Sequence, residues 1–315
     1  MRTAFIEQLC AIAEKDDRIW LVTGDLGYSV LEAFSDRFPS RYLNAGVAEQ
    51  NMMGIAAGLA LRGKVVFTYS IANFPIMRCL EQIRNDVCYH NLNVKIIAVG
   101  GGLAYGSHGY THHGVEDLAV MSSMPNMAVL APGDPIEARA ATIAIASQPG
   151  PAYLRLGKAG EPVLHNSPID FSLGKAIRMR DGSEFAIIST GGMLADALEA
   201  TKQLSAAGCS IRLLSMPTLV PFDVVAIQSA ASETFGIITV EEHGVGGLAT
   251  RTAEVLAAMG AGVPFIPLRL GRDPIRLAAS QVEMRSAQGL SVSGILATVE
   301  TLKIRAAKLP RKASP

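Results

Sequence analysis

Short apolar runs rich in β-branched residues alternate with helical patterns along this chain, and this alternation constrains the fold more than any other feature. In the first half, such runs lie at residues 19–23, 65–68, 94–99, 127–130 and 152–156. Helical spacing of apolar residues is found at about 3–15, 47–62, 74–90 and 134–147. Near-continuous apolar strands that alternate with helices are typical of a parallel sheet covered on both faces. The first half is therefore predicted to form a doubly wound α/β domain.

The alternation stops after residue 156 and resumes near residue 185, across a stretch rich in glycine and proline that is typical of a linker. In the second half, strands are expected at 185–189, 211–214, 237–240 and 265–268, and helices at about 193–207, 223–232, 247–259 and 293–307. We therefore predict two doubly wound α/β domains in series, residues 1–158 and 183–315, joined by the linker 159–182. The basic end at residues 308–315 is predicted to be frayed.

The low charge of the chain limits its partners and its compartment. Charged residues make up 18% of the sequence, and 28 Lys and Arg balance 28 Asp and Glu. A neutral chain lacks the basic surface that nucleic acids and anionic membranes require, so we expect neither as a partner. No apolar run reaches the roughly 18 residues that cross a bilayer, and Glu7 interrupts any signal-peptide core. Four cysteines without C-x-x-C spacing indicate a reduced, cytoplasmic protein, and its low charge favours self-association.

One carboxylate stands out within an apolar helix. Glu49 lies near the start of the expected helix 47–62, just after the glycine turn at Gly46, and most of the following residues are small or apolar. An acidic residue in a first helical turn commonly complements the helix dipole and the free N–H groups. The apolar neighbourhood weakens that interpretation, because this helix is expected to be buried on most sides. A functional role for Glu49 stays open on these grounds.

Several motifs in order resemble those of the transketolase family. The segment Gly46-Val-Ala-Glu-Gln-Asn-Met52 is similar to the signature of the family's pyrimidine-binding domain. Further similar segments follow in the family's order and spacing, at residues 81–85, 91–96, 109–117, 130–134, 215–217, 222–223 and 240–247. The resemblance implies a thiamine diphosphate-binding domain of the pyrimidine type followed by a transketolase C-terminal domain. The chain is also loosely similar to deoxyxylulose phosphate synthase and to the β subunits of 2-oxo acid dehydrogenases.

The family's diphosphate-binding motif is missing from this sequence. Transketolases hold the phosphates of thiamine diphosphate and Mg²⁺ with a Gly-Asp-Gly…Asn motif in an N-terminal domain, and the linker segment Arg180-Asp-Gly182 lacks that context. A diphosphate needs a cation and backbone donors. The resemblance therefore implies the C-terminal subunit of a split transketolase. A separate N-terminal subunit would supply the Mg²⁺ ligands, and two such pairs would form a dimer of heterodimers.

The resemblance also implies contacts to the cofactor. Glu49 becomes a catalytic residue, since a carboxylate bonded to the far ring nitrogen of the aminopyrimidine promotes the imino tautomer that deprotonates the thiazolium carbon. Phe74 matches an aromatic residue that stacks on the pyrimidine, although without the family it would equally be a core residue. Asp25, followed by Leu26, comes after a strand, where α/β sheets place ligand groups. Asp25 could equally cap a helix at residues 29–37.

The same resemblance implies contacts to a substrate. His112 matches the family histidine that faces the substrate carbonyl and assists proton transfer, and its glycine-flanked loop favours a functional role. Arg2, Ser29 and Arg155 match positions that hold the substrate phosphate, for which a planar guanidinium is suited. Arg155 lies in an apolar strand, where its burial would be costly without an anionic partner.

Four departures from the family pattern predict altered specificity. Ile71 and Met77 stand where the family has aromatic residues, so Ile71 would contact the cofactor in a changed pocket. Gly100 stands in place of a histidine, and His108 in place of an aspartate that contacts the donor hydroxyl. A carboxylate only accepts a hydroxyl proton, whereas histidine donates or accepts. The substrate is therefore expected to be an unusual sugar that contacts His108.

Other sites are not favoured. His108, His112, His113 and Glu116 would have ligand spacing on a helix, but the glycines among them prevent one, so we predict no metal site in this chain. Residues 240–247, with two glutamates and a histidine, are interpreted as an interface turn that leads into a helix.

The function favoured by the resemblance is transfer of a two-carbon ketol unit from a ketose, usually phosphorylated, to an aldose. One alternative is a decarboxylating enzyme that forms C–C bonds, similar to deoxyxylulose phosphate synthase. Another is a non-catalytic assembly subunit, against which the presence of Glu49, Phe74 and His112 argues.

Overall fold

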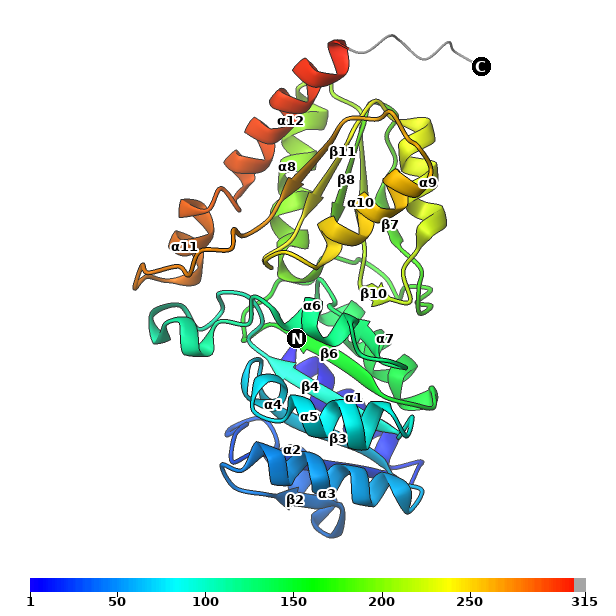
Figure 1. Ribbon diagram of the computed structural model, residues 1–315, viewed down its shortest axis with the longest axis vertical. Coiled ribbons are helices and arrows are strands. Elements are labelled where there is room, and N and C mark those ends of the chain that lie inside the picture. Colours follow the sequence, from blue (N-terminus) through cyan, green and yellow to red (C-terminus); the bar gives the residue numbers. More distant parts are fainter. Residues whose placement is uncertain (309–315) are drawn as a thin grey trace.

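The computed structural model describes residues 1–308, and within them the chain forms two stacked α/β units, each built on its own sheet (Figure 1). The first sheet has seven strands in the order β10-β5-β6-β4-β3-β1-β2. Their bounds are β1 Ile19–Thr23, β2 Tyr42–Asn44, β3 Val65–Ile71, β4 Val94–Val99, β5 Ala128–Leu130, β6 Ala152–Leu156 and β10 Thr218–Val220. Neighbouring strands are parallel except β10, which pairs antiparallel with β5. The predicted parallel sheet is confirmed, while β2 and β10, each of three residues, were not expected.

Helices cover both faces of the first sheet, as predicted. One face carries α1 Arg2–Ala13 and α7 Pro135–Ser147, and the other carries α3 Glu49–Leu61 and α6 Asp117–Ser122. Successive strand residues point to opposite faces. In β1, Leu21 belongs to the apolar cluster of Phe5 in α1, and Val22 to the cluster of Met53 in α3. Short segments complete this unit: α2 Glu32–Ser35 and the 3₁₀ turns Pro39–Arg41, Gly106–His108 and Tyr110–His112.

The helix expected at residues 74–90 is interrupted in the structure. Three short elements replace it: α4 Phe74–Met77, α5 Leu80–Gln82 and a π-helical segment Ile83–Cys88. The break falls at Cys79, whose φ of −131° and ψ of 30° are not helical, and whose Sγ donates to the Pro75 carbonyl at 2.9 Å. The apolar spacing continues across the break, because Ile76, Cys79 and Ile83 are all buried. Periodicity alone therefore could not reveal it.

The second sheet has five strands in the order β12-β11-β8-β9-β7, all parallel except for β7 with β9. The strands are β7 Ile177–Arg180, β8 Phe185–Ser189, β9 Ile211–Ser215, β11 Ile237–Val240 and β12 Phe265–Leu268. The helices are α8 Leu194–Ala206, α9 Val224–Glu233, α10 Leu248–Ala258, α11 Gln281–Ala287 and α12 Val292–Ala307, with a 3₁₀ turn at Gly191–Met193. Of the end that was predicted to be frayed, all but Lys308 lies outside the described residues.

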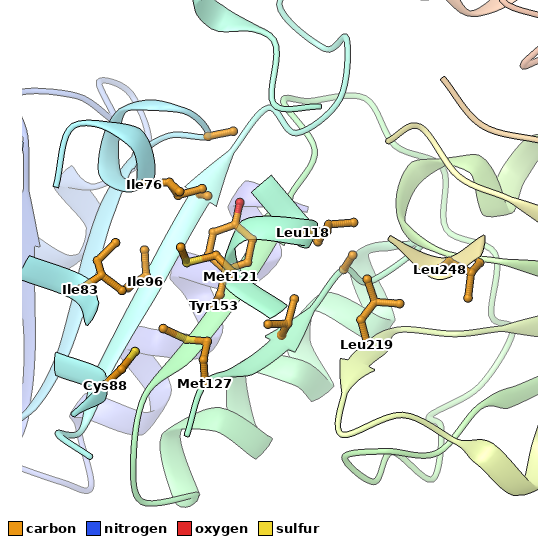
Figure 2. Packing of buried hydrophobic residues seen from close by; sticks show 14 of the residues in the cluster. Ile76, Ile83, Cys88, Ile96, Leu118, Met121, Met127, Tyr153, Leu219 and Leu248 are labelled. Carbon is orange, nitrogen blue, oxygen red and sulfur yellow. The ribbon is translucent and has the colours of Figure 1, made fainter. Parts of the chain in front are cut away.

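A continuous apolar cluster joins the two units (Figure 2). Leu118 and Met121 of α6 belong to it, and so do Leu219 of β10 and Leu248 of α10. All four side chains are fully buried. The two sheets are thus packed through one shared core, and β10, which follows β9 of the second unit in the chain, is an edge strand of the first sheet. No helix within residues 1–308 is both long and apolar enough to cross a membrane.

We expect Leu219→Ala to lower the free energy of unfolding by about 2–5 kcal/mol, because truncation of a buried leucine removes apolar burial and leaves a cavity. Urea unfolding of both proteins measures the difference. Val225→Ala on α9, where the side chain is 63% exposed, is the control, with an expected change within about 0.5 kcal/mol. A loss below about 1 kcal/mol at Leu219 would contradict a shared core.

Candidate active site

The residues selected from the sequence gather at the carboxyl edge of the first sheet. They are Asp25, Leu26 and Ser29 after β1, Glu49 after β2, Ile71 and Phe74 at the end of β3, His108 and His112 after β4, and Arg155 in β6. Arg2, at the start of α1, lies beside Tyr69 of β3, where its charge opposes the burial that raises the pKa of Tyr69 to about 12. Ligands of open parallel sheets bind at this edge. Ten residues that are distant in sequence therefore share one region.

Glu49 opens α3 with its side chain turned into the protein. The residue is only 4% exposed, and its Oε1 accepts a hydrogen bond from Arg78 Nη1 at 2.9 Å. It does not cap its helix, since the N-cap is Ala48 and has no side-chain hydrogen bond. A Cβ added at Gly24 would lie 3.8 Å from Glu49 Cγ, so the loop after β1 passes close to this carboxylate. The buried carboxylate of Glu49 is therefore paired with Arg78, whose side chain is partly exposed.

Phe74 and Arg78 connect Glu49 to the segment after β4, residues 100–116, which carries His108 and His112 and is called the histidine loop below. The guanidinium carbon of Arg78 lies 3.9 Å from the centroid of the Phe74 ring. The ring of His112 meets Phe74 edge-on, with centroids 5.2 Å apart. His108 follows, its ring centroid 5.2 Å from that of His112. Carboxylate, guanidinium, phenyl ring and imidazoles thus form one row of contacts.

His112 is held in a form suited to accepting a proton. Partial burial lowers the pKa of its imidazole, and the charges of His108, His113 and Arg78 lower it further. Its Nδ1 lies 3.0 Å from Thr111 Oγ1. The neighbouring His113 is 1% exposed and its Nε2 lies 2.9 Å from the Gly106 carbonyl oxygen, which makes it part of the loop's framework.

The loop after β1 has an unusual backbone and does not cap a helix through Asp25. Asp25 and Ser29 adopt left-handed φ values of 59° and 61°. The carboxylate of Asp25 accepts hydrogen bonds from Asn44 Nδ2 at 2.9 Å and from the Tyr28 hydroxyl at 3.1 Å. The helical segment that follows, α2, has Leu31 at its N-cap instead. Asp25 therefore links the loops after β1 and β2.

Arg155 has the anionic partner that its burial required. Its Nε lies 3.1 Å from Asp117 Oδ2, and both side chains are at most 7% exposed. Its Nη2 donates to the carbonyls of Gly114 and Glu242 at 2.8 and 2.9 Å. Arg155 also lines a cavity of about 170 Å³ between the two units, which Lys158 borders as well.

Residues 240–247 form a turn that leads into α10, as expected, and this turn lies at the junction of the two units. The carboxylate of Glu241 accepts hydrogen bonds from the N–H groups of Leu248 and Ala249 at 2.8 Å each, at the start of α10. Gly244 N donates to the Val115 carbonyl in the first unit at 2.8 Å. Within residues 1–308, no group of three or more His, Cys, Asp or Glu side chains is arranged to hold a metal ion.

Sequence reasoning missed Arg78, which touches both Glu49 and Phe74. A signal was present, because residues four apart on a helix lie on the same face. Arg78 follows Phe74 by four positions and retains helical φ and ψ values of −73° and −26°. Tyr105 was missed too. Its ring centroid lies 5.8 Å from that of His112, and Lys158 Nζ lies 5.0 Å from the Tyr105 ring centroid.

Comparison with known proteins identifies both parts of the chain. Residues 1–160 match the family model of the transketolase pyrimidine-binding domain, and residues 174–295 that of the transketolase C-terminal domain. An apulose-4-phosphate transketolase subunit of Phocaeicola vulgatus is 40% identical over 259 residues, which cover 81% of this chain and 83% of the relative. A 6-deoxy-6-sulfo-D-fructose transketolase subunit of a Clostridium species is 37% identical, covering 85% and 83%. A solved structure described as a split-gene transketolase, inactive β4 tetramer, superposes with a TM-score of 0.86 at 35% identity, covering 96% and 97%.

Two histidines of this chain should have pKa values on opposite sides of that of an ordinary imidazole, with His112 below it and His165 above it. Burial and cationic neighbours lower the pKa of His112, whereas at His165 the hydrogen bond and charge of Glu137 outweigh burial and raise the pKa. NMR titration of the imidazole C–H resonances measures both midpoints, with His112→Gln and His165→Gln used for assignment. A midpoint of His112 at or above that of His165 would refute the described surroundings.

Proposed function

Because the chain belongs to the transketolase family, we propose that it is the C-terminal subunit of a split transketolase, which moves a two-carbon ketol unit from a ketose to an aldose. The matches to the two domain models, at residues 1–160 and 174–295, carry this proposal. The split-gene structure supports it, since the two chains cover each other almost completely. When bound, thiamine diphosphate supplies the thiazolium carbon that attacks the ketose.

The pyrimidine half of the cofactor fits the residues around Glu49. A buried carboxylate suits a ring N–H, and a phenyl face suits stacking on a planar heterocycle. With the cofactor bound, Glu49 would hold the proton at the far ring nitrogen, and His112, whose lowered pKa favours the neutral imidazole, would accept or return a proton at the substrate carbonyl. We assign cofactor contacts to Asp25, Leu26, Glu49, Ile71 and Phe74.

The diphosphate half does not fit this chain alone. The Gly-Asp-Gly…Asn motif is missing from the sequence, and the described residues offer no cluster of metal ligands. We therefore assign Mg²⁺ and the phosphates to an N-terminal partner subunit. The rim of the site supports a covering chain, because Val47, Tyr28 and Met77 expose 73, 71 and 44% of their surface. Two such pairs would form a heterotetramer in the cytoplasm.

The substrate we propose is a sugar with an anionic group. Two relatives are named for transketolases of apulose 4-phosphate and of 6-deoxy-6-sulfo-D-fructose, and both of these sugars carry an anionic oxygen group. Cationic side chains near the site suit such a group, with Arg2 beside Tyr69 and Lys158 beside Tyr105. We assign substrate contacts to Arg2, Ser29, His108, His112 and Arg155.

Calorimetric titration of thiamine diphosphate with Mg²⁺ tests the split site. We expect binding when this chain is mixed with its N-terminal subunit, and none to the chain alone, because the diphosphate ligands lie on the partner. The N-terminal subunit alone is the matched control. Tight binding to the isolated chain would contradict the split arrangement, and no binding to the mixture would contradict the proposed function.

Glu49→Gln should lower kcat by about 10²- to 10⁴-fold, since glutamine cannot hold the proton that the pyrimidine nitrogen shares. Steady-state turnover by the assembled enzyme measures the loss, and thermal unfolding and light scattering check folding and assembly. Glu254→Gln makes the same change at an exposed position on α10 and should leave turnover unchanged. Near-normal turnover of the Glu49→Gln enzyme would remove Glu49 from the mechanism.

A further inference from the structure

Arg78 makes the two contacts that the site offers to a planar heterocycle. Its Nη1 donates to Glu49 Oε1 at 2.9 Å, and its guanidinium carbon stands 3.9 Å from the centroid of the Phe74 ring. A guanidinium is a flat N–C–N system with N–H groups at its edge and an extended face. An aminopyrimidine ring with a protonated nitrogen presents the same features. Both groups would use the same carboxylate and the same phenyl ring.

We propose that Arg78 occupies the pyrimidine position of this site while the cofactor is absent, and that cofactor binding displaces it. The inference rests on the proposed function, because it takes Glu49 and Phe74 as the pyrimidine contacts. It adds a self-occupied state of the site, in which one side chain of the protein competes with the cofactor.

Burial explains why Glu49 needs a partner in both states. A carboxylate that is 4% exposed loses most of its hydration, and an unpaired charge there would be strongly destabilising. Arg78 satisfies it within the chain. The arginine side chain itself is 45% exposed, so it can leave toward solvent at a modest cost.

Arg78 lies at an interruption of the helical backbone. Arg78 is the last helical residue after α4, and the next residue, Cys79, has non-helical dihedral angles. The π-helical segment Ile83–Cys88 follows shortly afterwards. Interrupted and π-helical segments are frequent at functional sites. The side chain therefore projects from a joint between short elements rather than from a continuous helix.

Displacement of Arg78 must weaken cofactor binding, because the free energy of its two contacts is lost when the pyrimidine takes their place. An arginine that is removed cannot compete. We therefore expect Arg78→Met, in the assembly with the N-terminal subunit, to bind thiamine diphosphate with Mg²⁺ about threefold to thirtyfold more tightly than the wild type. The affinity of the Arg78→Lys assembly should lie between those of the wild type and Arg78→Met, since lysine keeps the charge but lacks the flat face of the guanidinium.

Calorimetry of cofactor-free assemblies measures these constants without relying on turnover. Arg62→Met is the matched control, because it removes an exposed arginine at the opposite end of α3 and should leave the dissociation constant unchanged. Equal or weaker binding by the Arg78→Met assembly, with the wild type binding normally, would overturn the displaced arginine and leave the proposed function intact. No binding by the wild type would overturn both.

A second measurement uses the isolated chain and covers the case in which Arg78→Met fails to fold. In the wild-type chain labelled with ¹⁵N-arginine, the Arg78 side-chain N–H signals should be shifted upfield by the Phe74 ring and protected from exchange with water. Glu49→Gln and Phe74→Leu should each remove these properties. An Arg78 signal that matches the exposed arginines in the wild-type chain would refute the self-occupied state.

Discussion

The buried ion pair between Arg155 and Asp117 fixes the position of the loop that carries His112. The pair lies where the first sheet meets the second unit, and the hydroxyl of Tyr153 donates to the same carboxylate oxygen, Asp117 Oδ2, at 2.6 Å. Nη2 of Arg155 donates to the carbonyls of Gly114 and Glu242, one from each unit. Removal of one member would leave a buried charge without its partner, which is far more costly than the loss of an exposed pair. One guanidinium therefore couples the loop that carries His112 to the packing of the two units.

The second unit supports the loop after β4 through Glu242. Glu242 accepts hydrogen bonds from Leu103 N at 3.1 Å, from Gln281 Nε2 and from Arg285 Nη2 at 2.7 Å. Leu103 belongs to the histidine loop, so this loop is tied to the second unit on one side and to Arg155 on the other. A rigid support of this kind reduces the entropic cost of holding His112 in one orientation.

The sequence predicted those features that depend on local periodicity or on motifs. Most strands of the two sheets were predicted because they are apolar on both faces. Glu49, Phe74 and His112 were selected because they match motifs of the family, and their roles stay predictions. Features that depend on long-range approach were missed. Strand β10 is only three residues long and gains its place by pairing with β5, from a distant part of the chain. The partners of Arg155 and the ion pair of Arg78 likewise follow from tertiary packing, which no spacing in the sequence encodes.

A chain that carries half of a binding site has to remain stable while the other half is missing. The apolar side chains exposed around Glu49 can remain in contact with water until a partner binds, because a single apolar side chain at the surface costs little free energy. The buried carboxylate cannot, since its charge needs a partner at all times. Arg78 supplies the positive charge that Glu49 requires, and its guanidinium also packs on the ring of Phe74, as we propose for the pyrimidine of the cofactor. In this proposal, Arg78 keeps the pocket in its binding shape before assembly. The free energy needed to displace it weakens cofactor binding and does not lower the stability of the chain.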